Sequence, residues 1–191
     1  MADPSKKLIV GITGASGVIY GLETLKILKT LGYETHAVVS RAAEKNFLIE
    51  TPHTMDALGQ AATHLHDEAD LTAPIASGSF LTRGMVVIPC SIKSLSGIAH
   101  AYDDNLLIRA ADVTLKERRP LVLVVRETPL HTGHLNLMLA AASMGAVILP
   151  PVPAFYHHPE TILDLIHHTV GKVLDALAIP HDLFKRWGSG Q

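Results

Sequence analysis

Short apolar runs alternate with longer amphipathic segments along this chain. The runs are continuous, which is typical of strands buried on both faces of a parallel sheet. The longer segments space their aliphatic residues three or four positions apart, which predicts helices. We expect strands at 8–12, 35–39, 85–88, 121–125 and 146–149. We expect helices at 20–31, 41–49, 55–62, 91–100, 106–117, 135–144 and 161–177.

The order of these elements predicts the fold class. Strands alternating with helices imply right-handed crossovers, and hence an α/β fold with a doubly wound, mostly parallel sheet and helices on both faces. Pro89 is expected to break the third strand. The prolines within 150–153 are expected to direct the last helix away from the sheet, toward a neighbouring subunit or over the site. Because the chain shows neither a repeat nor a linker, we expect one domain over 1–191, with a core of about 7–177 and a tail at 178–191.

Composition narrows the class of protein. Of 191 residues, 48% are apolar and the net charge is −2, which favours a globular protein and argues against a nucleic-acid partner. The apolar runs are shorter than a membrane span, and no signal peptide is visible, so we expect a cytoplasmic protein without a membrane partner. The single cysteine, Cys90, excludes an internal disulfide. A mean hydropathy of +0.27 indicates that other subunits cover some apolar surface, or that the sheet core is thick.

Two polar loops follow the first two strands, at the edge where open parallel sheets bind ligands. The segment 11–17 is rich in glycine and precedes a helix, so its backbone can approach a phosphate. It can equally be a tight turn without a ligand, because its spacing departs from the dinucleotide and Walker patterns. Ser40 is interpreted as a helix N-cap, and Glu50 taken alone as a solvated carboxylate.

Two further loops follow later strands. The segment 89–97 holds three serines and Lys93 before a helix, which suits an anion or ring oxygens but also a plain capped helix. Cys90 is interpreted there as a small core residue rather than a nucleophile. Arg126 and Glu127 stand together at a strand end, where they either meet a ligand or form an internal salt bridge.

The paired histidines do not favour a metal site. His157 with His158, and His167 with His168, are adjacent in sequence, so their side chains point in different directions. No cysteine-rich or H-x-x-x-H pattern typical of zinc is present. We therefore expect no metal.

Long segments of the chain together resemble one family, the UbiX-type flavin prenyltransferases. The resemblance runs from about residue 7 to 177. The segments that carry it are Gly11-Ile-Thr-Gly-Ala-Ser-Gly17, Pro89-Cys-Ser-Ile-Lys-Ser94, Asp104-Asn-Leu-Leu-Ile-Arg109-Ala-Ala-Asp-Val-Thr-Leu-Lys116-Glu-Arg-Arg119, Leu123-Val-Val-Arg126-Glu-Thr-Pro-Leu-His131 and Gly145-Ala-Val-Ile-Leu-Pro-Pro-Val-Pro-Ala-Phe-Tyr156.

The resemblance implies an FMN-binding, Rossmann-like or flavodoxin-like subunit, assembled as trimers within a dodecamer, with active sites at subunit interfaces. It implies FMN contacts at Gly14, Ala15, Ser16, Ser40, Ser91, Ile92, Lys93, Ser94 and Arg126. It implies prenyl phosphate contacts at Arg109, Lys116, Arg126, Glu127, Tyr156 and Lys172. It implies catalytic roles for Ser16, Glu50, Glu127 and Tyr156. At the position of Lys172 the family sometimes has arginine. The compact ammonium group of lysine therefore replaces a planar guanidinium that can form two parallel hydrogen bonds.

The implied reaction joins dimethylallyl monophosphate to reduced FMN at N5 and C6 without a metal. The product, prenylated FMN, would pass to a UbiD-type decarboxylase. Two alternatives have the same fold: a flavin-dependent decarboxylase, and an FMN carrier without catalysis. The carrier would need the FMN loops but not the basic residues with Glu127 and Tyr156.

Overall fold

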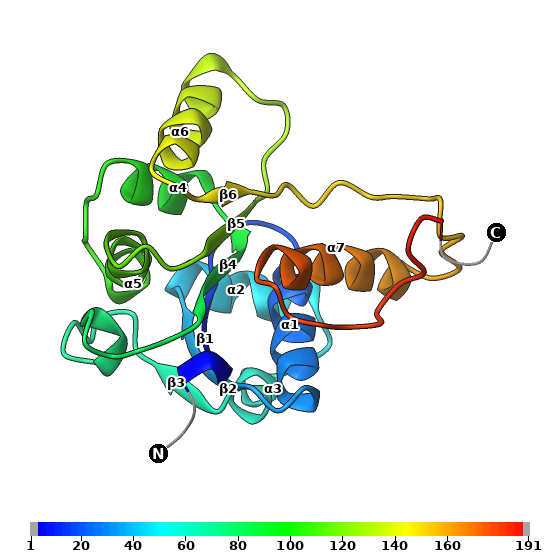
Figure 1. The fold of residues 1–191 in the computed structure, drawn as a ribbon, viewed down its shortest axis with the longest axis horizontal. Coiled ribbons are helices and arrows are strands. Elements are labelled where there is room, and N and C mark those ends of the chain that lie inside the picture. The colour runs from blue at the N-terminus through cyan, green and yellow to red at the C-terminus, as the bar shows by residue number, and fades with distance from the viewer. Residues whose placement is uncertain (1–3, 189–191) are drawn as a thin grey trace.

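Six parallel strands form one sheet in the order β3–β2–β1–β4–β5–β6 (Figure 1). The computed structural model describes residues 4–188. The strand order reverses between β1 and β4, which is the place where doubly wound sheets bind ligands. The strands are β1 (Lys7–Ile12), β2 (Glu34–Val39), β3 (His64–His66), β4 (Gly84–Cys90), β5 (Leu121–Val125) and β6 (Val147–Ile148).

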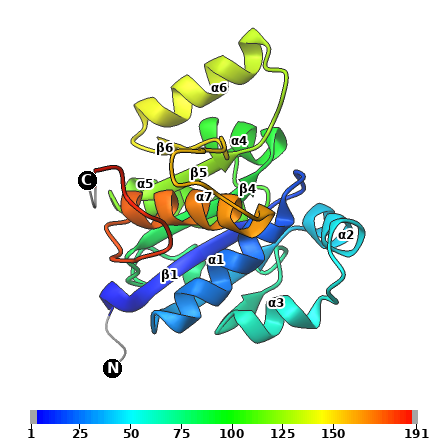
Figure 2. The ribbon, with the colours of Figure 1, turned by 90° about the vertical axis from the view of Figure 1, so that its right-hand side faces the viewer.

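Helices cover both faces of the sheet. α1 packs with α2, α3 and α7 on one face, while α4 packs with α5 and α6 on the other (Figures 1 and 2). The fold class expected from the sequence is therefore confirmed. The helices are α1 (Val18–Thr30), α2 (Arg41–Glu50), α3 (Asp56–Ala61), α4 (Ile92–Ala99), α5 (Leu106–Lys116), α6 (Thr132–Ser143) and α7 (Ile162–Ala176), with 3-10 turns at Pro4–Lys6 and Pro74–Ala76.

The sheet separates two hydrophobic cores. Alternate residues of β1 serve each core, with Val10 and Ile12 beneath α1 and α7, and Ile9 beneath α4 and α5. A strand buried on both faces needs apolar side chains at every position, which explains the continuous apolar runs. The result is a rigid platform whose carboxyl edge presents the polar loops.

The third strand continues further than expected. β4 passes through Pro89 and still pairs Cys90 with Val125, with a register irregularity after Val87. The Pro89 carbonyl accepts hydrogen bonds from both the backbone and the side chain of Thr13. The strand thus tolerates proline because the pairing shifts locally, and the expected break at Pro89 was wrong.

Other differences lie at the ends of the chain and at the sheet edge. α7 is not directed away from the sheet, because its apolar face packs against α1, with Val170 and Leu174 fully buried. The following residues also belong to the core, since Ile179 is buried and Phe184 packs against α7 at Gly171. The part of the expected tail at 189–191 lies outside the described residues. The edge strand β3 was not predicted, because its three residues are polar or exposed.

α6 stands out from the body of the molecule (Figure 2). Ala141 is its one buried residue, whereas Leu135 and Leu139 are exposed. Because α6 is apolar but buries so little of its surface within this chain, we expect it to contact another surface. Within residues 4–188, no helix is long and apolar enough to cross a membrane.

The buried thiol of Cys90 gives a test of this packing. Cys90 is fully buried, and burial raises the pKa of its thiol to about 12. We expect the native protein to react with a thiol reagent at pH 8 about a thousandfold more slowly than the unfolded chain, because the thiolate is the reacting form. Spectrophotometric thiol titration with and without guanidinium measures this ratio. Rapid, stoichiometric labelling of the native protein would contradict the packing.

Candidate functional site

A polar cavity of about 410 Å³ lies at the carboxyl edge of the sheet, beside the switch between β1 and β4. It is formed by the loops after β1, β2 and β4 and by the start of α5. Five residues expected from the sequence to contact a cofactor line it: Gly14, Ser40, Ser91, Lys93 and Ser94. The parallel topology brings these loops together, although they are separated by up to 80 residues (94 − 14) in the chain.

The buried Thr13 side chain joins two of the loops. Its hydroxyl donates to the Pro89 carbonyl at 2.8 Å and accepts from the Ser91 amide at 2.7 Å. The Ser40 amide donates to the carbonyl of Ile12 at 3.0 Å, which adds the third loop. Thr13 was not singled out from the sequence. The sequence shows only that a threonine follows a buried strand. This pattern is too common to identify a residue that joins two loops.

The N-terminus of α4 is the best anion site of this cavity. Ser91 caps the helix by accepting from the Ser94 amide, and its hydroxyl lies 3.2 Å from that of Ser94. The amides of Ile92 and Lys93 have no hydrogen-bond partner within residues 4–188. Free amides at the positive end of a helix dipole, beside two hydroxyls and a lysine, suit a phosphate or a ring oxygen.

The N-terminus of α2 is less available. Ser40 accepts from the Ala43 amide, which confirms its interpretation as an N-cap. The Arg41 amide donates to the carboxylate of Glu68 at 3.0 Å, and Glu68 lines the cavity. The carboxylate partly neutralises this helix end, so an anion is better placed at α4.

Gly14 has a packing reason to be glycine. A Cβ at this position would overlap with the Cβ of Ala42 in the first turn of α2. The glycine-rich loop therefore lies directly against α2, and the two together form one wall of the cavity. Ala15 is buried behind this loop, and Ser16 is exposed at its tip.

Glu50 is not a free surface carboxylate. It accepts hydrogen bonds from the amides of Gly17 at 2.7 Å and Val18 at 3.3 Å, and so occupies the N-terminus of α1. These are the amides that the sequence suggested for a phosphate. Because Gly17 follows Ser16, this contact also brings Glu50 close to Ser16, although the two residues are 34 positions apart in the chain (50 − 16).

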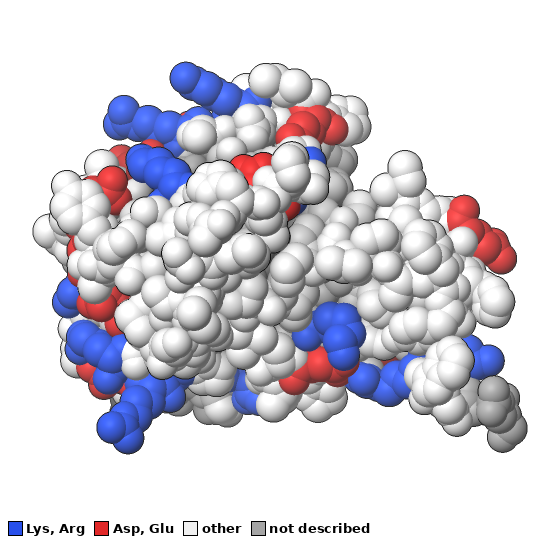
Figure 3. Space-filling view, turned by 90° about the horizontal axis from the view of Figure 1, so that it is seen from above, with Lys and Arg blue, Asp and Glu red and all other residues white. Residues whose placement is uncertain are grey.

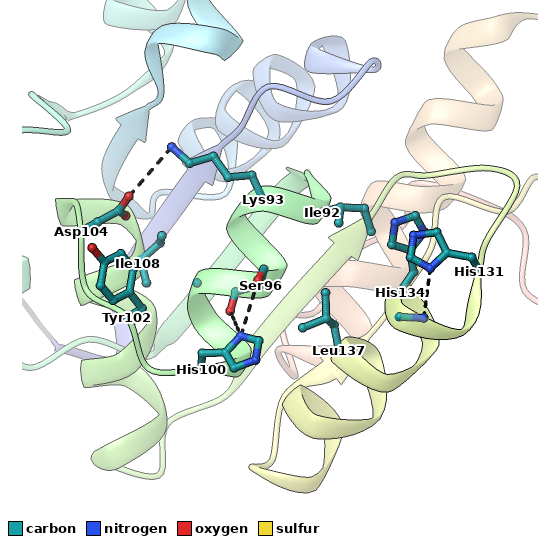
Figure 4. A pocket seen from close by; sticks show the side chains of 12 residues that line it. Ile92, Lys93, Ser96, His100, Tyr102, Asp104, Ile108, His131, His134 and Leu137 are labelled. Carbon is teal, nitrogen blue, oxygen red and sulfur yellow. Dashed lines mark hydrogen bonds and ion pairs between the residues drawn. The ribbon is translucent and has the colours of Figure 1, made fainter.

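A second, more apolar cavity of about 850 Å³ adjoins the first. It lies between α4, α6 and the loop before α5, and Lys93 and Ile108 line both cavities. Figure 4 shows Lys93 and Asp104 directed toward one another across its edge, 3.9 Å apart. His131, the N-cap residue of α6, and His134, in the first turn of that helix, line the cavity from the other side. Together the cavities offer a polar end at α4 and a wider apolar space beside it.

Arg126 and Glu127 are both exposed where β5 ends. No salt bridge joins them within residues 4–188: Glu127 accepts from the amide of Thr128, and the Arg126 guanidinium has no partner in that part of the chain. The internal salt bridge that the sequence left open is therefore absent there. Both side chains are free to meet a ligand or another subunit.

Tyr156 and Lys172 lie in the segment that follows β6. The Tyr156 hydroxyl is 3.1 Å from Nε2 of His168, a buried residue of α7. Burial lowers the pKa of His168, so its imidazole is neutral at pH 7. Lys172, one turn further along α7, is half-exposed and lies 3.7 Å from the Asp175 carboxylate.

Arg109 and Lys116 lie on α5, which runs from the carboxyl edge of the sheet toward its amino edge. Arg109 is held by Asp103 at 3.0 Å and Asp112 at 3.1 Å. Lys116 pairs with Glu117 at the far end of the helix, about 15 Å along its axis from Leu106. One chain therefore does not bring Lys116 to the cavity.

The face seen from above Figure 1 has few charges at its centre (Figure 3). Lys and Arg side chains gather mainly toward its margins. The exposed apolar residues that follow β5 include Leu135, Leu139, Val147, Val152 and Phe155. Such a surface is typical of a contact between subunits.

Known proteins share both this fold and this sequence. A family model described as Flavoprotein matches residues 1–173. Flavin prenyltransferase UbiX of Escherichia coli (strain K12) is 58% identical over 185 residues, covering 95% of this chain and 98% of that protein.

Two solved structures extend the comparison. AnUbiX (PadA1) in complex with FMN and dimethylallyl pyrophosphate has a TM-score of 0.95 at 44% identity, covering 98% of this chain and 100% of that one. A dodecameric FMN-dependent Ubix-like decarboxylase from Escherichia coli O157:H7 has a TM-score of 0.93 at 49% identity, covering 96% and 100%. The chain belongs to the flavoprotein family and, within it, to the flavin prenyltransferases of the UbiX type.

Proposed function

We propose that this protein transfers a dimethylallyl group from dimethylallyl monophosphate to N5 and C6 of reduced FMN. The observation that carries the proposal is the paired cavity at the carboxyl edge of the sheet, lined by the residues expected to contact FMN. Identity of 58% to a flavin prenyltransferase over nearly the whole chain supports it.

The residues of the cavity fit FMN. The free amides of α4, with Ser91, Lys93 and Ser94, offer donors to a phosphate or to the oxygens of the flavin ring. The apolar space between α4 and α6 suits the flat ring itself. Reduced flavin supplies the nucleophilic N5 and C6. The protein holds the flavin, orients it and excludes water.

The phosphate of the prenyl donor needs cations where negative charge grows as the allylic C–O bond breaks. We assign this role to Arg126 and Lys172, with Tyr156 as a hydrogen-bond donor. Arg126 has no partner among the described residues 4–188 and Lys172 is half-exposed, so neither must break a strong contact to bind. We propose that Glu127, next to Arg126 in the chain, accepts or returns a proton of the leaving phosphate.

Ser16 and Glu50 are proposed to accept the protons that leave N5 and C6. The hydrogen bond from the Gly17 amide keeps the Glu50 side chain beside the glycine-rich loop. Ser16 stands at the exposed tip of that loop. A hydroxyl next to a carboxylate can relay a proton to solvent.

We further propose that the site is completed by other copies of this chain. Arg109 and Lys116 lie along α5, which leads away from the cavity, so they are assigned to the site of a neighbouring subunit. The apolar surface around α6 provides a contact area. A relative of 49% identity is dodecameric, which supports trimers within a dodecamer here.

Prenylated FMN is useful only to an enzyme that employs it, and we propose a UbiD-type decarboxylase as the recipient. We also propose that the protein works in the cytoplasm, where reduced flavin and a reduced Cys90 persist.

One experiment separates the transferase from its alternatives. The purified protein is incubated with reduced FMN and dimethylallyl monophosphate without added metal, and the mass of the extracted flavin is measured by mass spectrometry. We expect a flavin heavier by one five-carbon unit. Unchanged FMN would favour the carrier, and carbon dioxide release from an aromatic acid without a second protein would favour the decarboxylase.

Tyr156→Phe and Glu127→Gln test the division of roles. Each removes one contact to the departing phosphate, so we expect turnover to fall about ten- to hundredfold while FMN stays bound. Single-turnover rates and bound-flavin absorbance measure the two effects. Tyr33→Phe, at a tyrosine outside the site, is the matched control. Loss of flavin from either site variant would overturn the assignment.

Gly14→Ala tests the cavity wall. The new methyl group must push the glycine-rich loop away from Ala42, so we expect FMN affinity to fall at least about tenfold, measured by quenching of flavin fluorescence. Gly59→Ala is the control, because a Cβ there meets no atom within 4 Å and alanine favours the helix. Equal flavin affinity in both variants would contradict the proposed site.

Leu139→Glu tests the assembly. This side chain of α6 is 66% exposed in the single chain, and a buried charge at a subunit contact would be costly. We expect sedimentation velocity to show smaller species at micromolar concentration. Leu139→Met keeps the surface apolar and should assemble normally. An unchanged oligomer in Leu139→Glu would place the contact elsewhere.

A further inference from the structure

A second group of titratable side chains lies at the opposite end of the sheet from the cavity. Glu34 begins β2, His36 follows two positions later, and His64 begins the neighbouring strand β3. Residues two apart in a strand point to the same face, and His36 pairs in register with His64. The three side chains therefore meet on one face of the sheet.

The distances within the group are short. Oε1 of Glu34 lies 3.1 Å from Nε2 of His36 and 3.4 Å from Nε2 of His64. One ligand atom from each residue can be chosen so that all three lie within 4.8 Å of one another. In a tetrahedral zinc site with bonds of about 2.0–2.2 Å, neighbouring ligand atoms are about 3.3 Å apart. The distances from Oε1 of Glu34 to the two histidine Nε2 atoms are already close to this value.

The surroundings hold His36 in place. Its side chain is buried, and its other nitrogen, Nδ1, lies 3.0 Å from Nε2 of His66. Phe80 packs edge-on against its ring. A metal-bound histidine is usually oriented in this way, by a hydrogen bond from its second nitrogen.

We propose that Glu34, His36 and His64 bind a borderline divalent metal ion, such as Zn²⁺, with His66 orienting His36. One carboxylate oxygen and two imidazole nitrogens form a ligand set that this class of ion prefers, and water would complete the tetrahedron. The ion would join β2 to the short edge strand β3. Its role is structural, because the cavity lies beyond the other end of these strands.

Two features of the empty site must change when an ion enters. The rings of His36 and His64 are stacked, with centroids 4.5 Å apart, so their lone pairs do not yet converge. The His64 side chain is 49% exposed and can turn toward the ion. Lys7 lies 3.3 Å from the same Glu34 oxygen, and its ammonium must share the carboxylate or move aside.

The test uses the full chain, freed of any histidine tag and stripped with a chelator, and Co²⁺ as a coloured probe for Zn²⁺. We expect one Co²⁺ per chain, with visible absorption typical of low coordination number, and displacement of Co²⁺ by Zn²⁺. Zn²⁺ should also raise the thermal midpoint, because it binds the folded state alone.

Variants locate the ion. His64→Gln and Glu34→Gln should weaken Co²⁺ binding at least about tenfold, whereas His100→Gln, at a histidine outside the group, should bind as the parent does. His64 is half-exposed, so its variant is expected to fold, which circular dichroism checks. Absence of saturable Co²⁺ binding, or equal binding in His64→Gln and the parent, would overturn the proposal. Neither result bears on flavin prenylation.

Discussion

The candidate site depends on one buried hydroxyl, that of Thr13. It donates to the end of β4 and accepts from the amide that begins the next loop, so it fixes the loops after β1 and β4 against each other. Both partners are backbone groups with few alternatives in a buried position. Without the hydroxyl the Pro89 carbonyl would keep its hydrogen bond from the Thr13 amide, whereas leaving the Ser91 amide unpaired would cost about 1–3 kcal/mol. The cavity is preorganised because its loops bond to one another rather than to solvent.

Most of the fold follows from patterns in the sequence. Continuous apolar runs predicted the long strands, because a strand beneath helices on both faces has no solvent side. The exceptions were decided by tertiary contacts. Pro89 stays in β4 because the pairing with β5 shifts locally at that point, and β3 forms from His64-Leu-His66 because β2 offers it an unpaired edge. Neither contact is visible in local sequence.

The site was predictable in part. The cavity-lining serines, Lys93 and Gly14 could be named because they follow strand ends and match family motifs. Sequence could not show that Glu50 already occupies the amides of α1, since the two segments are 33 positions apart. The sequence also could not show that Lys116 lies at the amino edge of the sheet, away from the cavity. The group of Glu34, His36 and His64 could not be recognised in the sequence, because its residues lie on two strands that only their pairing brings together.

The position of α5 affects how assemblies that mix intact and damaged chains would behave. If each reaction centre combines Tyr156 and Arg126 of one subunit with Lys116 of another, no chain is catalytically self-sufficient. Two inactive mutants, each damaged in a different half, would then regain some activity when co-assembled, as in intragenic complementation. A single damaged chain would impair centres beyond its own, so its defect would be partly dominant in a mixed assembly.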